Sequence, residues 1–522
     1  MEEITPIVAA LITLASAFLL HRAFFLRRRL RLPPGPKPWP IVGNMPQIGE
    51  AHLHSLLATM AGKYGPLMYL RLGSVDMVVA ASAAVAEQVL KIHDTNFLSR
   101  PPNAGAKYIA YNYQDMVFAP YGPRWRLLRK ISTVHLFSSK ALDDHRRIRE
   151  EEISVLVQAL ARSGEAPANL GSLLTVCIAN SLGRTMIGRR VFGDGSGSDD
   201  LESNQFKLMV EQVMVLAGKF NPGDFFPWLE WLDLMGVGRE MKKVHKWFDD
   251  FLTKIVEEHR NLLARGVGGG HQDLLSTLLS MKDDGEDENE KLNDTEIKAL
   301  LLNMFTAGTD TSASTVEWAL TELIRHPEMM AQAQQELDSI VGRDRAVSDV
   351  DLHQLVYLQA VVKETFRLHP PTPLSLPRMA SDSCEVNGYH IPKGSTLLVD
   401  VWAIGRDPKQ WVDPLEFRPN RFLPNGEKPH VDVKGNDFEV IPFGAGRRIC
   451  VGLSLGLRMV QMLTATIVHS FDWTLPNGLT PDKLNMDEHY GLTLRRAQPL
   501  IMHPRPRLLL GVYERDSYEY SN

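Results

Sequence analysis

One long helical pattern limits the possible folds of this chain more than any other feature. Asn293 and Glu296 form a predicted capping box, and helical periodicity continues from there to Arg325. Pro327 ends the pattern, because the residue before a proline disfavours helical backbone. A helix of about 33 residues is roughly 50 Å long at 1.5 Å per residue. The sequence therefore predicts a helix that can cross an entire domain.

The middle of this predicted helix contains residues that form helices poorly. It reads Ala307-Gly308-Thr309-Asp310-Thr311-Ser312. Glycine costs about 1 kcal/mol relative to alanine in a helix, and Thr and Asp compete for backbone hydrogen bonds. Such a cluster predicts a functional distortion, and the alternative is an ordinary helix bent by Ser and Thr.

Composition indicates one large globular unit. The chain has 522 residues, with no internal repeat and no internal linker that divides it, and its net charge of -5 gives no indication of nucleic-acid binding. Three cysteines, Cys177, Cys384 and Cys450, are too few for a disulfide framework and predict a reducing compartment. Cys177 and Cys384 are expected to be packing residues rather than ligands.

The N-terminus is predicted to be a retained membrane anchor. Residues 4–20 carry no charge, and the apolar run continues past His21 and Arg22 to residue 26. About 20 such residues span a bilayer as a helix. Arginines follow at once, so the positive-inside rule places the large domain in the cytosol. The alternative is a cleavable signal peptide, whose basic residues normally precede a shorter apolar core.

A proline-rich segment follows the anchor. Residues 33–40 contain five prolines in eight positions, which prevents helix continuation and predicts a stiff extended strut rather than a flexible linker. The expected division of the chain is an anchor with basic stop-transfer residues, the strut, a catalytic domain and a tail, over residues 1–31, 32–40, 41–507 and 508–522.

The strongest functional signal lies near the C-terminus. Phe443, Gly446, Arg448, Cys450 and Gly452 occupy every fixed position of the pattern FxxGxRxCxG. This segment resembles the thiolate-ligand loop of the cytochrome P450 family, the haem-thiolate monooxygenases. The resemblance implies that Cys450 is the axial ligand of haem iron and that Arg448 meets a haem propionate. The alternative for Cys450 is a buried small hydrophobic residue.

The centre of the long helix resembles the motif (A/G)Gx(D/E)T(T/S) of the same family. By this resemblance, Ala307 and Gly308 leave room for dioxygen. The Thr311 hydroxyl would hydrogen-bond dioxygen or a neighbouring water, and Asp310 would bring protons from solvent, because cleavage of the O–O bond consumes protons.

Two further sets of residues resemble supporting motifs of the family. Glu364 and Arg367 have the spacing ExxR on one helix face, and residues 417–422 are similar to the PxRF segment, which implies a buried structural network with Arg421. Trp125 and Arg129 match WxxxR, and Arg378 lies in a segment similar to another propionate contact. Arg129, Arg378 and Arg448 would then surround two carboxylates, and the alternative for each is a surface arginine.

These motifs occur in family order over nearly the whole chain. The resemblance implies the mainly α cytochrome P450 fold with small β-sheets, one haem domain and an N-terminal transmembrane helix, with haem b as cofactor and O2 as co-substrate. The anchor and strut are similar to those of plant microsomal members, which implies a single-pass protein of the endoplasmic reticulum membrane. No GxGxxG or GxxxxGK[ST] motif for NADPH or flavin appears, so NADPH-cytochrome P450 reductase is the expected electron donor.

The helix that carries WxxxR also predicts a docking face for this reductase. Arg126 and Lys130 are one turn apart and rotated by about 100° from Trp125 and Arg129, so they should point outward. Arg124 and Arg447 are expected neighbours. The patch would steer a donor with an acidic surface, and the alternative is an ordinary solvated basic face.

Several stretches resemble plant flavonoid 3'-hydroxylases within the family. Residues 431–435 match a run typical of them, whereas Met77 and Asn425 are single departures. Thr493 lies in the last substrate-recognition segment and favours one hydroxylation, at the 3' position of the B-ring of naringenin, dihydrokaempferol, kaempferol or apigenin type flavonoids. Alternatives are a flavonoid 3',5'-hydroxylase, another plant phenolic or terpenoid hydroxylase, a haem-thiolate enzyme that rearranges peroxides, and a non-catalytic haem sensor. Asp310 and Thr311 count against the last two.

An aromatic segment leaves two interpretations open. Residues 103–122 contain five aromatic side chains that would suit a flat polyphenol above the haem or would form a core patch: Tyr108, Tyr111, Tyr113, Phe118 and Tyr121.

Overall fold

The helix predicted from the capping box runs through the middle of the molecule as α14 (Asp294–Arg325). The Glu296 N–H donates to Asn293 Oδ1 (2.8 Å), and the Asn293 N–H donates to Glu296 Oε2 (3.0 Å), so the predicted capping box is confirmed. The α14 helix is buried along most of its length against α9 (Leu170–Ile187) and α18 (Leu453–Ser470). It remains α-helical through the cluster of poor helix formers.

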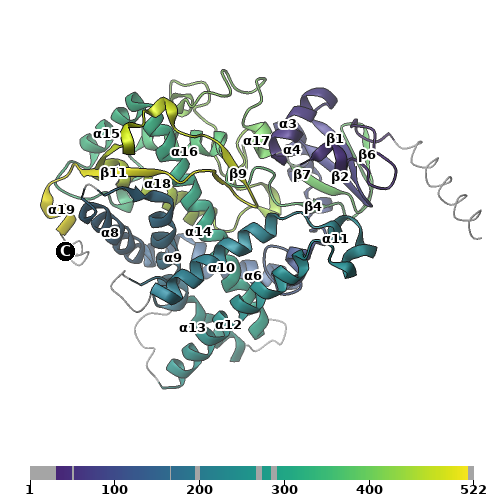
Figure 1. The fold of residues 1–522 in the computed structure, drawn as a ribbon, viewed down its shortest axis with the longest axis horizontal. Coiled ribbons are helices and arrows are strands. Elements are labelled where there is room, and N and C mark those ends of the chain that lie inside the picture. The colour runs from purple at the N-terminus through teal and green to yellow at the C-terminus, as the bar shows by residue number, and fades with distance from the viewer. Residues whose placement is uncertain are drawn as a thin grey trace, which may run out of the picture.

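The structure, a computed structural model, describes residues 31–49, 52–164, 166–193, 200–265, 273–283 and 291–514. It is mainly helical with small sheets, as expected (Figure 1). The other α-helices are α2 (Met45–Ile48), α3 (Leu53–Tyr64), α4 (Ala83–Glu87), α5 (Ala104–Tyr108), α6 (Pro123–Ser132), α7 (Ser139–Asp144), α8 (Arg146–Arg162), α10 (Asp200–Gly218), α11 (Pro222–Phe225), α12 (Val237–Ala264), α13 (Leu274–Asp283), α15 (Pro327–Ile340), α16 (Val356–Leu368), α17 (Val401–Ile404) and α19 (Leu510–Glu514). The predicted anchor up to residue 30 and the tail from residue 515 lie outside the described residues.

Four small sheets flank the helices. The largest has the order β1-β2-β7-β4, in which only the β2–β7 pair is parallel. The β1–β2 hairpin closes through Gly73, whose φ of +57° suits a two-residue turn, and sets the register Leu67↔Ala80. The strands are β1 (Leu67–Leu72), β2 (Val75–Ala80), β3 (Ala168–Asn169), β4 (Arg378–Met379), β5 (Cys384–Val386), β6 (Tyr389–Ile391), β7 (Thr396–Val399), β8 (Phe471–Thr474), β9 (Glu488–Tyr490), β10 (Leu494–Arg496) and β11 (Ile501–Pro506).

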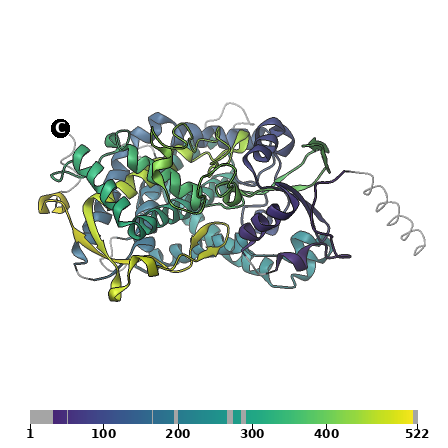
Figure 2. The same cartoon turned by 90° about the horizontal axis from the view of Figure 1, so that it is seen from above.

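The helical part and the four-stranded sheet occupy opposite ends of the molecule (Figure 1). Seen from above, the N-terminal strands lie at one end and the C-terminal strands at the other (Figure 2). The remaining sheets have the orders β3-β11-β8, β10-β9 and β5-β6. The β9–β10 hairpin packs beside α14, which brings residue 493 close to the middle of the long helix.

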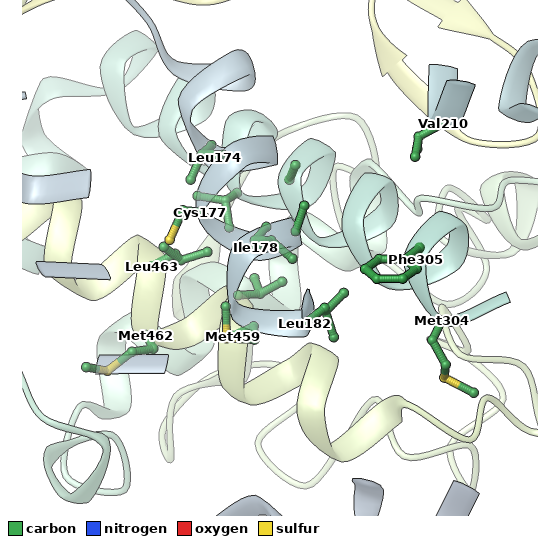
Figure 3. Packing of buried hydrophobic residues seen from close by; sticks show 14 of the residues in the cluster. Leu174, Cys177, Ile178, Leu182, Val210, Met304, Phe305, Met459, Met462 and Leu463 are labelled. Carbon is green, nitrogen blue, oxygen red and sulfur yellow. The ribbon is translucent and has the colours of Figure 1, made fainter. Parts of the chain in front are cut away.

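The main core forms between α9, α14 and α18. Cys177 lies in this cluster beside Leu174 and Ile178, as predicted for a packing residue (Figure 3). The α9 helix is the one helix among the described residues that is long and apolar enough to cross a membrane, but 67% of it is buried inside the protein. It is therefore a core helix, and the predicted anchor lies in a part of the chain that the structure does not describe.

The predicted strut is extended but lies against the domain. The Tyr69 N–H of β1 donates to the Pro34 carbonyl (2.9 Å), and the His390 N–H of β6 donates to the Arg31 carbonyl (2.7 Å). A Cβ atom on Gly35 would lie 1.9 Å from the Tyr69 carbonyl oxygen, so only glycine permits this approach. This segment thus docks on β1, the edge strand of the large sheet, and on β6, and is not a free-standing spacer.

The beginning of the predicted tail is also packed on the domain. Tyr513 of α19 is buried, and its hydroxyl accepts hydrogen bonds from the N–H groups of Arg507 and Leu508, both 3.0 Å long. Residues 508–514 therefore continue the globular unit beyond the predicted boundary.

Candidate active site

One interior cavity brings together most of the residues that the sequence singled out. Its volume is ≈ 280 Å³. The predicted residues in its wall come from α6, α14, β4 and the cysteine loop: Trp125, Arg129, Ala307, Gly308, Thr311, Arg378, Phe443, Gly444, Arg448, Cys450 and Gly452. Apolar side chains form much of the remaining wall, including Leu136, Ile178, Leu182, Met304, Phe366, Leu455, Met459 and Val460. The cavity can therefore hold a large apolar group with a few polar anchors.

The cysteine loop presents Cys450 to this cavity at the start of α18. The Cys450 N–H donates to the Phe443 carbonyl (2.9 Å), which closes the loop. Gly446 has a φ of +71°, and a Cβ atom there would lie 2.3 Å from the Leu90 carbonyl oxygen. Burial raises the pKa of the Cys450 thiol, whereas the Gly452 N–H and Arg129 oppose this change. The loop thus holds a sulfur atom with a hydrogen-bond donor beside it.

Three predicted arginines meet on one side of the cavity. Arg448 lies over the Trp125 ring (4.5 Å) and donates to the carbonyls of Leu98 (2.9 Å) and Ala119 (2.6 Å), but its Nη1 is buried without a partner among the described residues. Burial lowers the pKa of Arg448 to about 10, and the nearby Arg378 also lowers it. The unpaired N–H group of Arg448 and the positive charges of the neighbouring arginines fit a ligand that carries carboxylates.

An arginine close to Arg378 and Arg448 was missed from the sequence. Arg100 lines the cavity and donates to the carbonyls of Val117 (3.1 Å), Leu376 (2.8 Å) and Pro377 (2.8 Å). Burial lowers its pKa, and Arg378 and Arg448 lower it further. In the sequence, Arg100 stands out only because Pro101 and Pro102 follow it, and an arginine on the surface could stand in the same context.

The α14 helix presents one side of its predicted motif to the cavity. Ala307, Gly308 and Thr311 line the cavity. The Thr311 hydroxyl donates to the Ala307 carbonyl (2.8 Å) one turn earlier. A Cβ atom on Gly308 would lie 2.9 Å from Leu182 Cδ1, so this glycine also allows α9 to pack closely on α14. The motif therefore serves both packing and access to the cavity.

Asp310 and Thr493 lie on a different side of α14. Neither is among the described residues that line the large cavity. The Thr493 hydroxyl donates to Asp310 Oδ2, and Arg495 forms an ion pair with Asp310 Oδ1. The sequence placed Thr493 against the substrate, but the β9–β10 hairpin directs this side chain toward the helix.

The predicted supporting network is formed in the interior. Arg367 donates to both oxygens of Glu364 (2.7 Å each), and Arg421 Nε donates to Glu364 Oε1 (3.2 Å). All three side chains are at most 2% exposed. Arg367 also lies on α16 beside Phe366, whose ring packs at 5.2 Å from Phe443 of the cysteine loop. The network therefore connects to the loop through one aromatic contact.

The aromatic side chains of residues 103–122 do not form the wall of the cavity. None of the five aromatic residues in this segment is among the described lining residues, and the Tyr111 hydroxyl, for example, donates to Asp249 (2.8 Å). Met116 and Val117 line the cavity instead. Asn303 Oδ1 accepts from the Met116 N–H (3.0 Å) and the Val117 N–H (3.3 Å), which fixes this loop on α14.

The predicted basic face is present in part. Arg126 and Lys130 of α6 are exposed, as expected, and Arg447 is half exposed beside Asp94 (3.4 Å). Arg124 instead pairs with Glu296 at the start of α14, where its Nε donates to Glu296 Oε1 (2.8 Å). Its charge is thus offset, and the face is centred on Arg126 and Lys130.

Comparison with known proteins agrees with this geometry. The family model "Cytochrome P450" matches residues 33–502. A flavonoid 3'-monooxygenase of Petunia hybrida is 63% identical over 96% of this chain and 98% of its own length. The flavonoid 3'-monooxygenase of Arabidopsis thaliana is 63% identical over 95% of this chain and 96% of its own length. A flavonoid 3',5'-hydroxylase of Crocosmia x crocosmiiflora is 55% identical over 93% of each chain.

Solved structures give the same fold. A zebrafish cytochrome P450 determined with progesterone matches with a TM-score of 0.73 and 25% identity, over 88% of this chain and 100% of that chain. The family match and the full-length relatives agree with the cavity, the cysteine loop and the order of the motifs. The chain therefore belongs to the cytochrome P450 family.

Proposed function

We propose that the protein is a flavonoid 3'-monooxygenase that inserts one oxygen atom from O2 into the 3' position of the flavonoid B-ring. The observation that carries the chemistry is that Cys450 and the Ala307–Thr311 side of α14 line the same, largely apolar cavity. The choice of substrate is supported by the two relatives named flavonoid 3'-monooxygenase at 63% identity over nearly the whole chain.

The residues of the cavity fit haem b. Cys450 would bind the haem iron, and Arg129, Arg378 and Arg448 would bind the two propionates, for which the unpartnered Arg448 Nη1 is a ready donor. Arg100 adds a fourth guanidinium to this side. The chemistry that haem supplies when bound is the activation of dioxygen and the transfer of one oxygen atom to carbon.

The residues of this chain have separate tasks in that chemistry. The Gly452 N–H holds the Cys450 sulfur, and the apolar wall excludes water from the substrate. Thr311 holds a proton at its hydroxyl inside the cavity, and Asp310 moves protons toward it from outside. The Glu364 network supports the loop and takes no part in proton transfer.

Electrons are proposed to come from NADPH through a membrane-bound reductase. Exposed Arg126 and Lys130 on α6, next to buried Trp125, support a docking face for a donor with an acidic surface. The apolar residues 4–26 and the arginines after them support a single-pass anchor in the endoplasmic reticulum membrane with the catalytic domain in the cytosol.

The test is to express the full-length protein with reductase and supply NADPH with naringenin or dihydrokaempferol. We expect one new hydroxyl group, at the 3' position. Cys450→Ser should lose both this product and the reduced carbon monoxide spectrum typical of haem-thiolate proteins, whereas the half-buried control Cys384→Ser should keep them. A Cys450→Ser protein that retains the spectrum would contradict the assigned ligand.

The relative from Crocosmia x crocosmiiflora supports a second candidate, flavonoid 3',5'-hydroxylation. A wild-type protein that forms mainly the doubly hydroxylated product would favour this candidate over the first.

A further inference from the structure

Thr493 is fixed behind α14 and does not belong to the described wall of the large cavity. Its side chain is 3% exposed, and its hydroxyl donates to Asp310 Oδ2. The next residue, Leu494, holds the backbone in place. Its N–H donates to the Pro371 carbonyl (2.9 Å), and its carbonyl accepts from the Ser314 hydroxyl (2.9 Å). The position of Thr493 is therefore set by the fold and not by a ligand.

Asp310 is held by the β9–β10 hairpin through both of its oxygens. Thr493 donates to Oδ2, and Arg495 pairs with Oδ1. Beside this contact lies a second cavity of ≈ 30 Å³, which Asp310, Arg495, Thr309 and Glu211 border. That volume accommodates a water molecule. Thr309 Oγ1 is buried with no partner among the described residues and can bond a water there.

The two cavities lie on different sides of the same helix turn. Asp310 borders the small cavity, whereas the next residue, Thr311, lines the large one. Consecutive residues of an α-helix are rotated by about 100°, so the carboxyl group of Asp310 must leave its hairpin partners to approach the side of Thr311. Those partners therefore hold the Asp310 carboxylate at the small cavity, where it can take up a proton before it approaches Thr311.

We propose that Thr493 is a positioning residue for Asp310. Its hydroxyl, together with Arg495, keeps the carboxylate at the small cavity, where a carboxylate oxygen takes up a proton that bulk solvent supplies and a water molecule passes on. The same oxygen gives up this proton on the Thr311 side, and the carboxylate is restored. This inference rests on the proposed monooxygenase function and assigns Thr493 to proton delivery rather than to the shape of the substrate site.

Two variants separate the effect of the hydroxyl group from the effect of side-chain size. Thr493→Val keeps the shape and removes the donor, whereas Thr493→Ser keeps the donor and removes a methyl group. In full-length protein with reductase, we expect Thr493→Val to lower the ratio of product to released peroxide about tenfold, as for loss of one hydrogen bond to a charged group. Thr493→Val should also change how this ratio depends on pH and on the replacement of water by D2O. Thr493→Ser should resemble wild type in the ratio, in its pH dependence and in its response to D2O.

Substrate binding gives a readout that does not depend on turnover. Titration of the haem absorption spectrum with flavanone should give the same dissociation constant for wild type and for both variants, because Thr493 does not line the described cavity. The proposal would be overturned in favour of a size effect by two results together. Thr493→Val would keep the wild-type ratio of product to peroxide, and Thr493→Ser would change this ratio or bind flavanone more weakly. Wild-type behaviour of both variants would overturn it as well.

A double-mutant cycle tests the route through Asp310. Thr493→Val should have no further effect on the product ratio in an Asp310→Asn background, since the acid that Thr493 positions is then absent. Additive effects would contradict the inference. A wild-type protein that hydroxylates another phenolic compound but no flavonoid would instead contradict the proposed substrate, and the ratio of product to peroxide would then be compared with that compound.

Discussion

The buried carboxyl group of Asp400 is expected to contribute to the pH dependence of the free energy of unfolding. Asp400 precedes α17, and its Oδ1 accepts from the Ala403 N–H (2.9 Å). Burial raises the pKa of Asp400 to about 8, although this N–H and Arg406 oppose the change. The folded protein thus favours the neutral acid. Above the ordinary carboxyl pKa, Asp400 is ionised in the unfolded chain but still protonated in the folded protein. The free energy of unfolding therefore falls as pH rises from the ordinary carboxyl pKa to about 8, and the loss is constant above that.

Asp400→Asn should remove this dependence while it keeps the acceptor for Ala403. We expect the thermal midpoint of the variant to gain on that of wild type as pH rises toward about 8, with no further gain above it. Unfolding of the haem-loaded proteins between acidic and alkaline pH measures the difference. The control Asp382→Asn changes an exposed carboxylate and should follow wild type. A constant difference at every pH would contradict the raised pKa.

At the scale of residues, the sequence predicted which residues belong to the site better than it predicted which way their side chains point. Cys450, Arg129 and Arg448 line the cavity because a tight glycine loop and a helix face leave them few alternatives. The direction of Thr493 depends on how the β9–β10 hairpin docks on α14, which is a contact between segments about 180 residues apart that local patterns do not encode. Arg100 was missed for the same reason.

At the scale of elements, the network around Glu364 joins α16 to the segment Pro419–Phe422. Glu364→Gln should leave two buried guanidinium groups without their carboxylate, and breaking such a buried pair costs about 3–5 kcal/mol. We expect a much lower yield of haem-loaded protein and a lower thermal midpoint. The control Glu427→Gln removes a partially exposed partner of Arg421 and should cost less. Equal midpoints for the two variants would contradict the structural role.

The long helix shows why some elements are easy to predict. The capping box, the period of its apolar residues and Pro327 all act within a few residues, and α14 begins and ends where they indicate. The aromatic segment was undecided because packing against distant partners determines its side chains, as in the bond from Tyr111 to Asp249. The fold class was predictable from motif order, but the shape of the substrate wall at Met116 and Val117 was not.

At the scale of the whole molecule, the exposed face of α6 predicts how the reductase approaches. Reversal of Arg126 and Lys130 to Glu should slow turnover driven by reductase and weaken its dependence on salt, because electrostatic steering is lost. Turnover driven by added peroxide should remain near wild type. The control Lys393→Glu changes an exposed lysine that follows β6 and does not belong to α6. Equal losses in the reductase-driven and the peroxide-driven assay would indicate a folding defect instead.

The docked strut also determines how this protein can be re-engineered for expression. Carbonyl groups of Arg31 and Pro34 accept hydrogen bonds from β6 and β1, and Gly35 permits the close contact with β1. A substitute leader or a solubility tag should therefore be joined before Arg31. A junction placed within residues 31–36 would uncover the edge of the large sheet, and an unpaired edge is a template for aggregation.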